Sequence, residues 1–177
     1  DYTHLKWDLF VNRAKKGRKE WHYIFASAKL DKPLTPWIEI IDSISENFRG
    51  ILLLPVEAAS LFNNIADIKK FDPSYKKSDW NLLVCNNKVS GIRVVAFKND
   101  AVILSRMINI SQEKYPDVIA GIIEQELSNT IEFIKRLAHS NKEKFNIINI
   151  VSSDIKKYLS PAKFDNTNFF SFTPHEI

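Results

Sequence analysis

Glycine and cysteine are both scarce in this chain. Only 4 of the 177 residues are glycine, so there is little material for a loop that cradles phosphate with glycine backbone amides. Neither a Walker sequence nor a G-x-G-x-x-G pattern is present. Cys85 is the only cysteine, which excludes an internal disulfide and favours a reducing compartment.

Long apolar runs are also lacking. No run approaches the roughly 20 residues that a membrane-spanning helix needs, and no secretory signal is visible. The chain begins at Asp1 without a methionine, so we expect a part of a longer protein. A membrane anchor or further strands of that protein would then lie outside this sequence.

The charge balance is nearly even. The 25 basic and 21 acidic side chains give a formal charge of +4, which predicts nucleic-acid binding only if the cations gather in a patch. They gather in one loop, where nucleic acid is the weaker interpretation because no groove is lined. Two others stay open: a solvated loop, or a contact for an acidic protein surface or anionic lipid headgroups. The cations of this basic tip are Arg13, Lys15, Lys16, Arg18 and Lys19.

The first part of the chain predicts a hairpin, a helix and a strand followed by a helix. Thr35 and Pro36 open the first helix as a hydroxyl cap and a proline in the first turn. The connector over residues 66–79 is polar and broken by proline, so we place a lobe boundary near Lys77. Hydrophobic patterning predicts strands at 4–11, 20–28 and 51–54, and helices at 35–48 and 56–65.

The second part predicts a three-stranded meander, a long helix and a further strand. A short helix is expected to end before Pro161, and the aromatic tail over 164–177 to dock on the body of the protein or on a partner. The third strand is expected to place Val102, Leu104 and Arg106 on one face. The main elements are predicted at 80–85, 91–97 and 101–110 (strands), 116–138 (helix) and 145–151 (strand).

Glu126 falls at the centre of the apolar stripe of the long helix. A carboxylate in that position must be paired or must shift its pKa. Arg106 stands among apolar residues on a strand of the meander, so we predict that Arg106 and Glu126 form a buried pair between helix and sheet. The pair is interpreted as structural, because no second acid is placed to work with Glu126 in catalysis.

Few residues are placed for chemistry. A ribonuclease-H-type nuclease needs clustered carboxylates for two metal ions, and the strand over 80–85 has none. An actin-type ATPase needs an acid and small residues just after that strand, but Asn86, Asn87 and Lys88 occupy the turn. The four histidines are scattered, which makes a zinc site improbable. Cys85 ends a buried strand and is interpreted as a small core residue.

A family resemblance rests on these runs of sequence. The run from Trp80, Trp-Asn-Leu-Leu-Val, and the run Ile92-Arg-Val-Val-Ala-Phe-Lys-Asn-Asp-Ala-Val-Ile-Leu-Ser-Arg106 are similar to the second-lobe meander of actin-like assembly proteins. More narrowly, the chain resembles the actin-like cytoplasmic components of type IV pilus and type II secretion inner-membrane platforms. The matching helix pattern is Glu126 followed by Thr130. Upstream, the segments over 21–28 and 51–61 resemble the part that closes the first lobe.

The resemblance implies an α/β protein with an actin-like, ribonuclease-H-like fold in two lobes, each a mixed sheet flanked by helices. The lobes would be 1–77, which is partial, and 78–177. It implies a scaffold without catalysis or cofactor, at the inner face of a bacterial inner membrane. Its partners would be the cytoplasmic tails of membrane proteins and an assembly ATPase. Two alternatives stay open: a nucleotide-binding ATPase with a degenerate phosphate loop at Asn86, Asn87 and Lys88, and a nucleic-acid-binding module.

Overall fold

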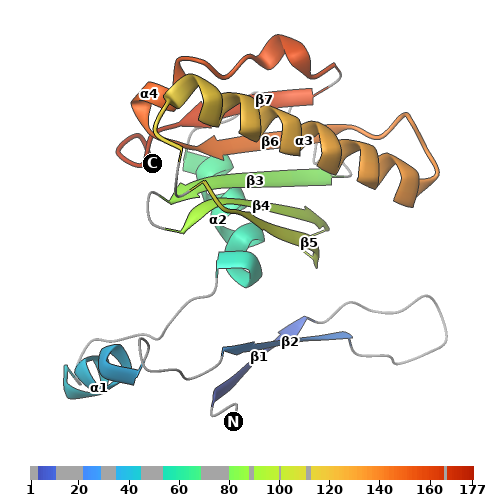
Figure 1. The fold of residues 1–177 in the computed structure, drawn as a ribbon. Helices are drawn as coiled ribbons and strands as arrows, with labels where there is room; N and C mark the ends of the chain where they lie inside the picture. The colour runs from blue at the N-terminus through green and yellow to red at the C-terminus, as the bar shows by residue number, and fades with distance from the viewer. Residues whose placement is uncertain are drawn as a thin grey trace, which may run out of the picture. The chain divides into compact units, whose positions relative to one another are not determined.

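The protein forms two compact units, Asp1–Leu53 and Leu54–Ile177, of which most of the second is described (Figure 1). The structure is a computed structural model. It describes residues 4–10, 22–28, 35–44, 54–68, 80–87, 90–99, 101–110, 113–165 and 167–177.

The described residues of the first unit form an antiparallel ribbon and one helix. β1 (His4–Phe10) pairs with β2 (His22–Ala28), with His4 opposite Ala28. This confirms the predicted hairpin. α1 (Thr35–Ser43) follows and begins at the predicted residue. The basic tip from Arg13 to Lys19 and residues 45–48 of the expected helix lie outside the described residues.

The second unit is built on one mixed sheet of five strands in the order β5-β4-β3-β6-β7. β3, β4 and β5 form an antiparallel meander, and β6 and β7 then add parallel to β3. A meander, a long helix and a parallel strand are what the sequence predicted for the start of a ribonuclease-H-like lobe. The strands are β3 (Trp80–Asn87), β4 (Gly91–Lys98), β5 (Ala101–Ile108), β6 (Phe145–Ile150) and β7 (Thr167–Phe172).

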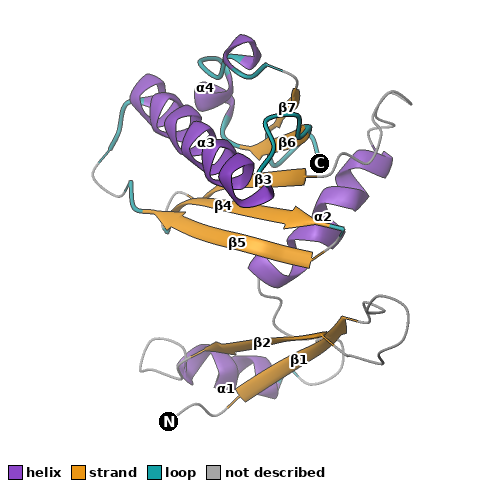
Figure 2. Cartoon of the chain, turned by 90° about the vertical axis from the view of Figure 1, so that its right-hand side faces the viewer, coloured by secondary structure: helices purple, strands orange, loops and turns teal. Residues whose placement is uncertain are grey.

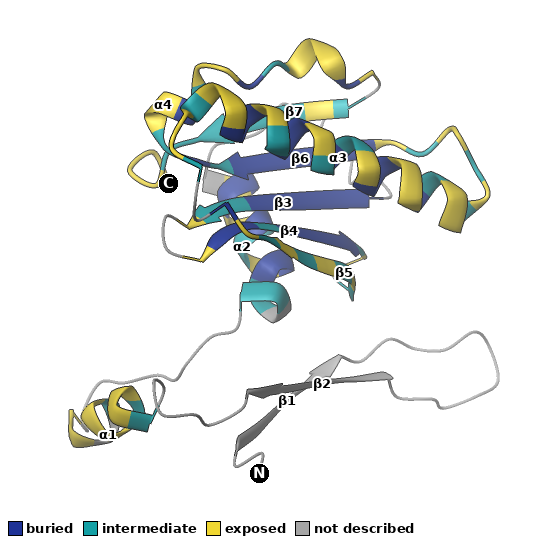
Figure 3. Ribbon diagram, viewed as in Figure 1, coloured by how far each residue is buried: buried dark blue, intermediate teal, exposed yellow. Residues whose placement is uncertain are grey.

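Helices cover both faces of this sheet (Figure 2). α3 (Pro116–Ala138) packs on one face and α2 (Leu54–Ile68) on the other. Successive side chains of β3 therefore enter different cores: Leu82 packs with the α3 side and Leu83 with the α2 side. β3 and β4 are buried along most of their length (Figure 3). No helix that the structure describes has the length and hydrophobicity needed to cross a bilayer.

α2 differs from the sequence prediction in its start and in its partner. Leu54 is the first helical residue rather than the end of a strand, and Pro55 lies in the first turn. Residues 51–53, expected in that strand, lie outside the described part. α2 packs on the meander, where the rings of Phe62 and Phe97 meet edge to face at 5.2 Å. The compact unit therefore begins at Leu54, and not near Lys77 as the polar connector indicated.

The C-terminal aromatic segment is a strand of the sheet. β7 pairs in parallel with β6, and α4 (Ser153–Lys156) and the 3₁₀ turn η1 (Pro161–Lys163) connect the two strands. Phe169 stacks on Phe164 on the α3 side with ring centroids 5.3 Å apart. Phe170 packs on the α2 side. Docking of the segment was predicted, but its pairing as a strand was not.

A β-bulge in the pairing of β4 with β5 reverses the face of the sheet on which part of β5 places its side chains. The pairing of β4 with β5 shifts between Ala96 and Phe97, so Ala96 faces Leu104 while Phe97 faces Val102. An inserted residue reverses the faces of the strand beyond it. Val102 therefore packs in the α2-side core and Leu104 against the α3-side core. The prediction that Val102 and Leu104 share a face is wrong for this reason.

We expect a fragment of residues 54–177 to unfold cooperatively, and a fragment of residues 78–177 to be much less stable. The shorter fragment lacks α2, so Leu83, Phe97 and Ile148 lose their cover. The loss of the Phe62 side chain alone is worth about 3–5 kcal/mol. Urea unfolding followed by circular dichroism measures the difference. Equal midpoints for the two fragments would contradict the placement of α2 in this unit.

Candidate functional site

The carboxyl ends of the three parallel strands meet at one edge of the sheet and border a cavity of about 540 Å³. In open α/β sheets, ligands bind outside the carboxyl ends of the strands. The cavity is therefore the natural candidate for a ligand site. It is lined by Asn86 and Asn87 after β3, Ser152, Ser153 and Asp154 after β6, and Thr173, Pro174 and His175 after β7.

Asn86 contributes the most distinctive group in this lining. Its Oδ1 is buried and has no hydrogen-bond partner in the described part of the chain. Asn149 on β6 has a second buried Oδ1 of this kind, and its Nδ2 donates to the Phe170 carbonyl at 3.0 Å. Since a buried acceptor without a donor is costly, this edge favours a donor, such as an ordered water molecule or an amine.

A hydrogen bond joins the two described ends of the turn between β3 and β4. The Asn87 Oδ1 accepts a hydrogen bond from the Ser90 backbone amide, three residues on, at 3.3 Å. Gly91 has a φ of +97°, and a Cβ at this position would lie 2.3 Å from the Ile108 carbonyl oxygen. The turn therefore needs this glycine for its close approach to β5. Lys88, the one cation expected here, lies outside the described residues.

The opposite wall is held by the last turn of the chain. The Glu176 carboxylate accepts hydrogen bonds from the Thr173 amide at 2.6 Å and from the Lys156 Nζ at 2.8 Å. Hydrogen bonds lower the pKa of Glu176 to about 2; the bond from Lys156 has the largest effect and the bond from the Thr173 backbone amide the next largest. This contact fastens Thr173 and His175 beside α4, so β7 and α4 form one side of the cavity.

The lining is poor in groups for catalysis. Asp154 is the one carboxylate among the lining residues, and it pairs with Lys157 at 3.4 Å. Within the described ranges, no group of three or more His, Cys, Asp or Glu side chains is arranged to hold a metal ion. Two-metal hydrolysis requires several convergent carboxylates, and a phosphate cradle requires free backbone amides. The described lining residues lack such a set of carboxylates, and at the turn after β3 the Ser90 amide already donates to the Asn87 Oδ1.

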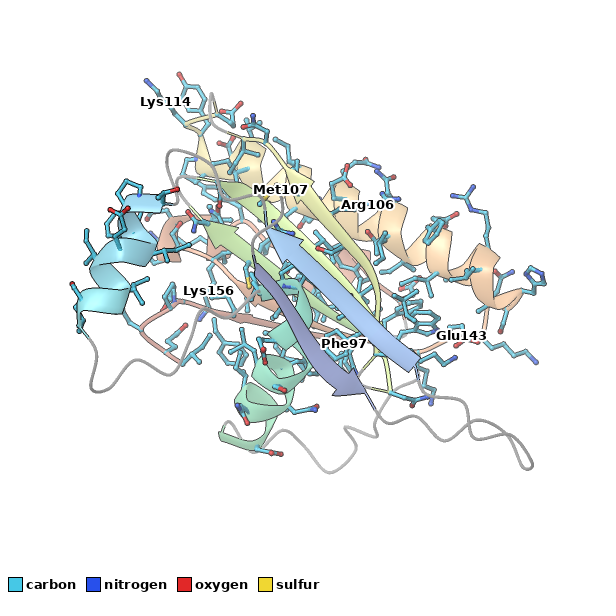
Figure 4. The ribbon with its side chains drawn as sticks, turned by 90° about the horizontal axis from the view of Figure 1, so that it is seen from below. Phe97, Arg106, Met107, Lys114, Glu143 and Lys156 are labelled. Carbon is cyan, nitrogen blue, oxygen red and sulfur yellow. The ribbon has the colours of Figure 1, made fainter. Side chains whose placement is uncertain are left out.

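Arg106 and Glu126 do meet, but at the surface. Their closest charged atoms, Nη1 and Oε2, lie 3.9 Å apart, and the side chains are 40% and 25% exposed. Arg106 also lies over the ring of Phe133 at 5.8 Å, on the side of β5 that faces α3 (Figure 4). The predicted contact is therefore present, whereas its burial is wrong. The helix presents this edge of its stripe to solvent because β5 is the last strand of the sheet.

The buried carboxylate of α3 is Glu124. Its side chain is 7% exposed, it forms an ion pair with the Lys163 Nζ, and its Oε1 accepts the Ser160 amide at 2.7 Å. The segment between α4 and β7 covers this flank of the helix and brings both partners. Burial of Glu124 was not predicted, because a helical wheel shows the apolar stripe but not the loop that buries the flank of the helix. The adjacent acid at Glu126 drew the prediction instead.

Comparisons with known proteins give one distant likeness. No protein-family model matches the chain, and no curated protein matches it. The chain is similar to a solved structure from Bacteroides thetaiotaomicron, described as a protein with an actin-like ATPase fold and unknown function. The identity is 10% and the TM-score 0.45, over 96% of this chain and 53% of that one. This chain thus spans about half the length of that protein, and an overlap of this quality carries no functional argument.

We expect Glu124→Ala to destabilise the protein by about 1–3 kcal/mol, since it leaves the Ser160 amide without its acceptor. The matched change Glu126→Ala on the same helix is expected to cost no more than about 0.5 kcal/mol, as for an exposed ion pair. Urea unfolding of the two variants provides the comparison. A larger loss for Glu126→Ala than for Glu124→Ala would contradict the assignment of the buried carboxylate.

We expect Cys85 to be unreactive in the folded protein. Burial raises the pKa of its thiol from 9.0 to about 11, and Arg93 opposes this in part. At neutral pH the folded thiol therefore holds roughly a hundredfold less thiolate than an unfolded one. Alkylation by iodoacetamide, with and without urea, measures the difference. Stability from the neutral thiol is present below pH 9 and is lost as the pH rises towards 11. Equal alkylation rates with and without urea would contradict the burial of Cys85.

Proposed function

We propose that this chain belongs to an actin-like protein and acts as a scaffold that binds other proteins without hydrolysing nucleotide. The turn after β3 carries this proposal. It occupies the place where an actin-type lobe holds phosphate, yet Asn87 binds its Ser90 amide and Gly91 serves the approach to β5. A lobe that keeps its frame without a phosphate cradle is suited to holding partners.

The finer assignment is a role in the inner-membrane platform of a type IV pilus or a type II secretion system. Its support is the resemblance of the run from Ile92 to Arg106, and of Glu126 with Thr130, to the second lobe of such components. In this proposal residues 54–177 form the main part of one lobe and the preceding residues part of another. The partners are cytoplasmic tails of membrane proteins and an assembly ATPase, met at the inner face of the membrane.

Nucleotide binding is the second candidate. The cavity at the carboxyl ends of β3, β6 and β7 favours it, because ligands of open α/β sheets bind at such edges. The buried Asn86 Oδ1 is an acceptor that an exocyclic amine would satisfy. Against it stand the closed turn at Asn87 and the single carboxylate Asp154. We therefore rank it below the scaffold role.

Calorimetric titration with ATP and Mg²⁺ tests the proposal. We expect no binding tighter than about 100 μM, since the Ser90 amide already donates to the Asn87 Oδ1 and Asp154 is the one carboxylate among the described lining residues. An Asn86→Ala variant serves as the control for the cavity. Tighter binding by the natural chain that is lost in Asn86→Ala would replace the scaffold role with nucleotide binding at this edge.

A further inference from the structure

Three asparagines form a row across the sheet. Asn81 on β3 pairs in register with Asn146 on β6, which pairs in register with Asn168 on β7. The Asn168 Nδ2 donates to the Asn146 Oδ1 at 2.8 Å, and the Asn146 Nδ2 donates to the Asn81 Oδ1 at 2.9 Å. The side-chain amides thus repeat the pairing of the backbones beneath them, as in the asparagine ladders of stacked parallel strands.

The row runs from the interior to the rim of the sheet. Asn146 is 0% exposed and Asn81 is 8% exposed, whereas Asn168 is exposed. Each amide carries both a donor and an acceptor, so the chain of hydrogen bonds ends on Asn168 with one half of its amide not used in the row. Reversing all three amides changes only which half remains. With the hydrogen bonds as assigned, the Asn168 Oδ1 is the unused half and accepts from a donor. A side-chain amide carries a donor and an acceptor, so it can extend the row in either assignment.

The backbone of β7 is oriented to continue the sheet. The Phe172 carbonyl accepts the Val151 amide at 3.0 Å, so the backbone groups of Phe172 point towards β6. Because backbone direction alternates along a strand, Phe169 and Ser171 point their amides and carbonyls away from β6. β7 is the last strand on this side of the sheet, and both residues are partly exposed.

The composition of β7 leaves this edge without protection. Natural edge strands are blunted by lysine, proline or other charged residues. β7 reads Thr-Asn-Phe-Phe-Ser-Phe and contains no charge, no proline and no glycine. Such a segment readily pairs with another strand. An edge strand that lacks these residues and presents the side-chain amide of Asn168 is suited to pairing with another strand in a fixed register.

We propose that β7 receives an extended segment of a partner protein as a sixth strand. The segment runs parallel to β7 and carries an asparagine or glutamine opposite Asn168, with small apolar residues opposite Phe170 and Phe172. Strand addition supplies affinity through the backbone of Phe169 and Ser171, and the amide supplies register. This names the kind of segment that the scaffold of the proposed function would bind, and it rests on that function.

A second copy of the chain fits this edge less well. Two copies related by a two-fold axis would pair their β7 strands antiparallel. Asn168 lies near the start of β7, so antiparallel pairing along the whole strand sets it opposite the far end of the other copy. The row of amides would then end at Asn168, whereas a parallel segment extends it.

Titration of the fluorescently labelled peptide Lys-Thr-Asn-Thr-Val-Thr-Val-Lys with the chain tests the proposal. We expect binding by fluorescence anisotropy, and slower hydrogen exchange of the Phe169 and Ser171 amides in the complex. Replacing the peptide asparagine by leucine is expected to weaken binding about tenfold, the value of one net hydrogen bond. Absence of binding, or equal affinity for the leucine peptide, would overturn the proposal.

Two variants of the chain locate the contact. Ser171→Pro removes an outward amide without touching the pairing of β7 with β6, because proline is tolerated where the amide faces away from the sheet. It is expected to abolish peptide binding, while Ser171→Thr retains the amide and should retain binding. Asn168→Leu is expected to lose about tenfold. Urea unfolding confirms that each variant is folded, and full binding by folded Ser171→Pro would overturn the assignment to β7.

Capture of partners separates this proposal from the function on which it rests. If partners of an inner-membrane platform are retained by the natural chain but not by Ser171→Pro, both stand. Retention by both chains keeps the scaffold role and overturns docking on β7. Self-association of the natural chain in sedimentation, abolished by Ser171→Pro, would assign the edge to a second copy instead.

Discussion

Burial of β3 on both faces is the constraint on which the second unit depends. β3 pairs with β4 on one side and β6 on the other, and helices cover it above and below. Leu82, Leu83 and Val84 are fully buried, so this strand has no room for an ionised side chain without a partner. Polar groups on β3 lie only near its two ends, at Asn81 and at Asn86 and Asn87. The chemistry of the unit is therefore confined to its edges.

The polar groups at the carboxyl edge of the sheet and those along its outer strand β7 have different roles. At the carboxyl edge, the hydrogen bond of Asn87 with the Ser90 amide and the contact of Glu176 with Lys156 hold loops in place. At the outer edge, β7 presents backbone groups outward, and the Asn168 Oδ1 takes no part in the row of asparagine hydrogen bonds. This arrangement of polar groups is the physical basis of the proposed scaffold role.

Local periodicity made much of the second unit predictable. The meander from Trp80 and the helix from Pro116 to Ala138 have strong patterns, and the structure confirms them. Their cores follow from alternation along β3 and from the apolar stripe of α3. The proline after Tyr115 also marked the start of the helix correctly.

Tertiary context decided what the sequence could not predict. The apolar residues of α2 were expected to pack on a strand before them, but the face that they cover belongs to strands far along the chain. Glu124 is buried by a loop some 36 residues away in sequence. β7 was seen only as an aromatic tail, since neither its alternation nor its charge distinguishes an edge strand from a docked segment. The row of asparagines depends on register, which a single sequence does not reveal.

That row also bears on how the chain avoids misfolding. Parallel strands rich in isoleucine and phenylalanine can slip past one another with little loss of hydrophobic contact. A slip of one residue between β6 and β3 would bring Asn146 onto the face of the α3 core and leave Asn81 opposite an apolar neighbour. The cost of two buried amides without partners then opposes every wrong alignment. The asparagines thus fix the register of β3, β6 and β7 in a sheet whose other buried residues are largely apolar.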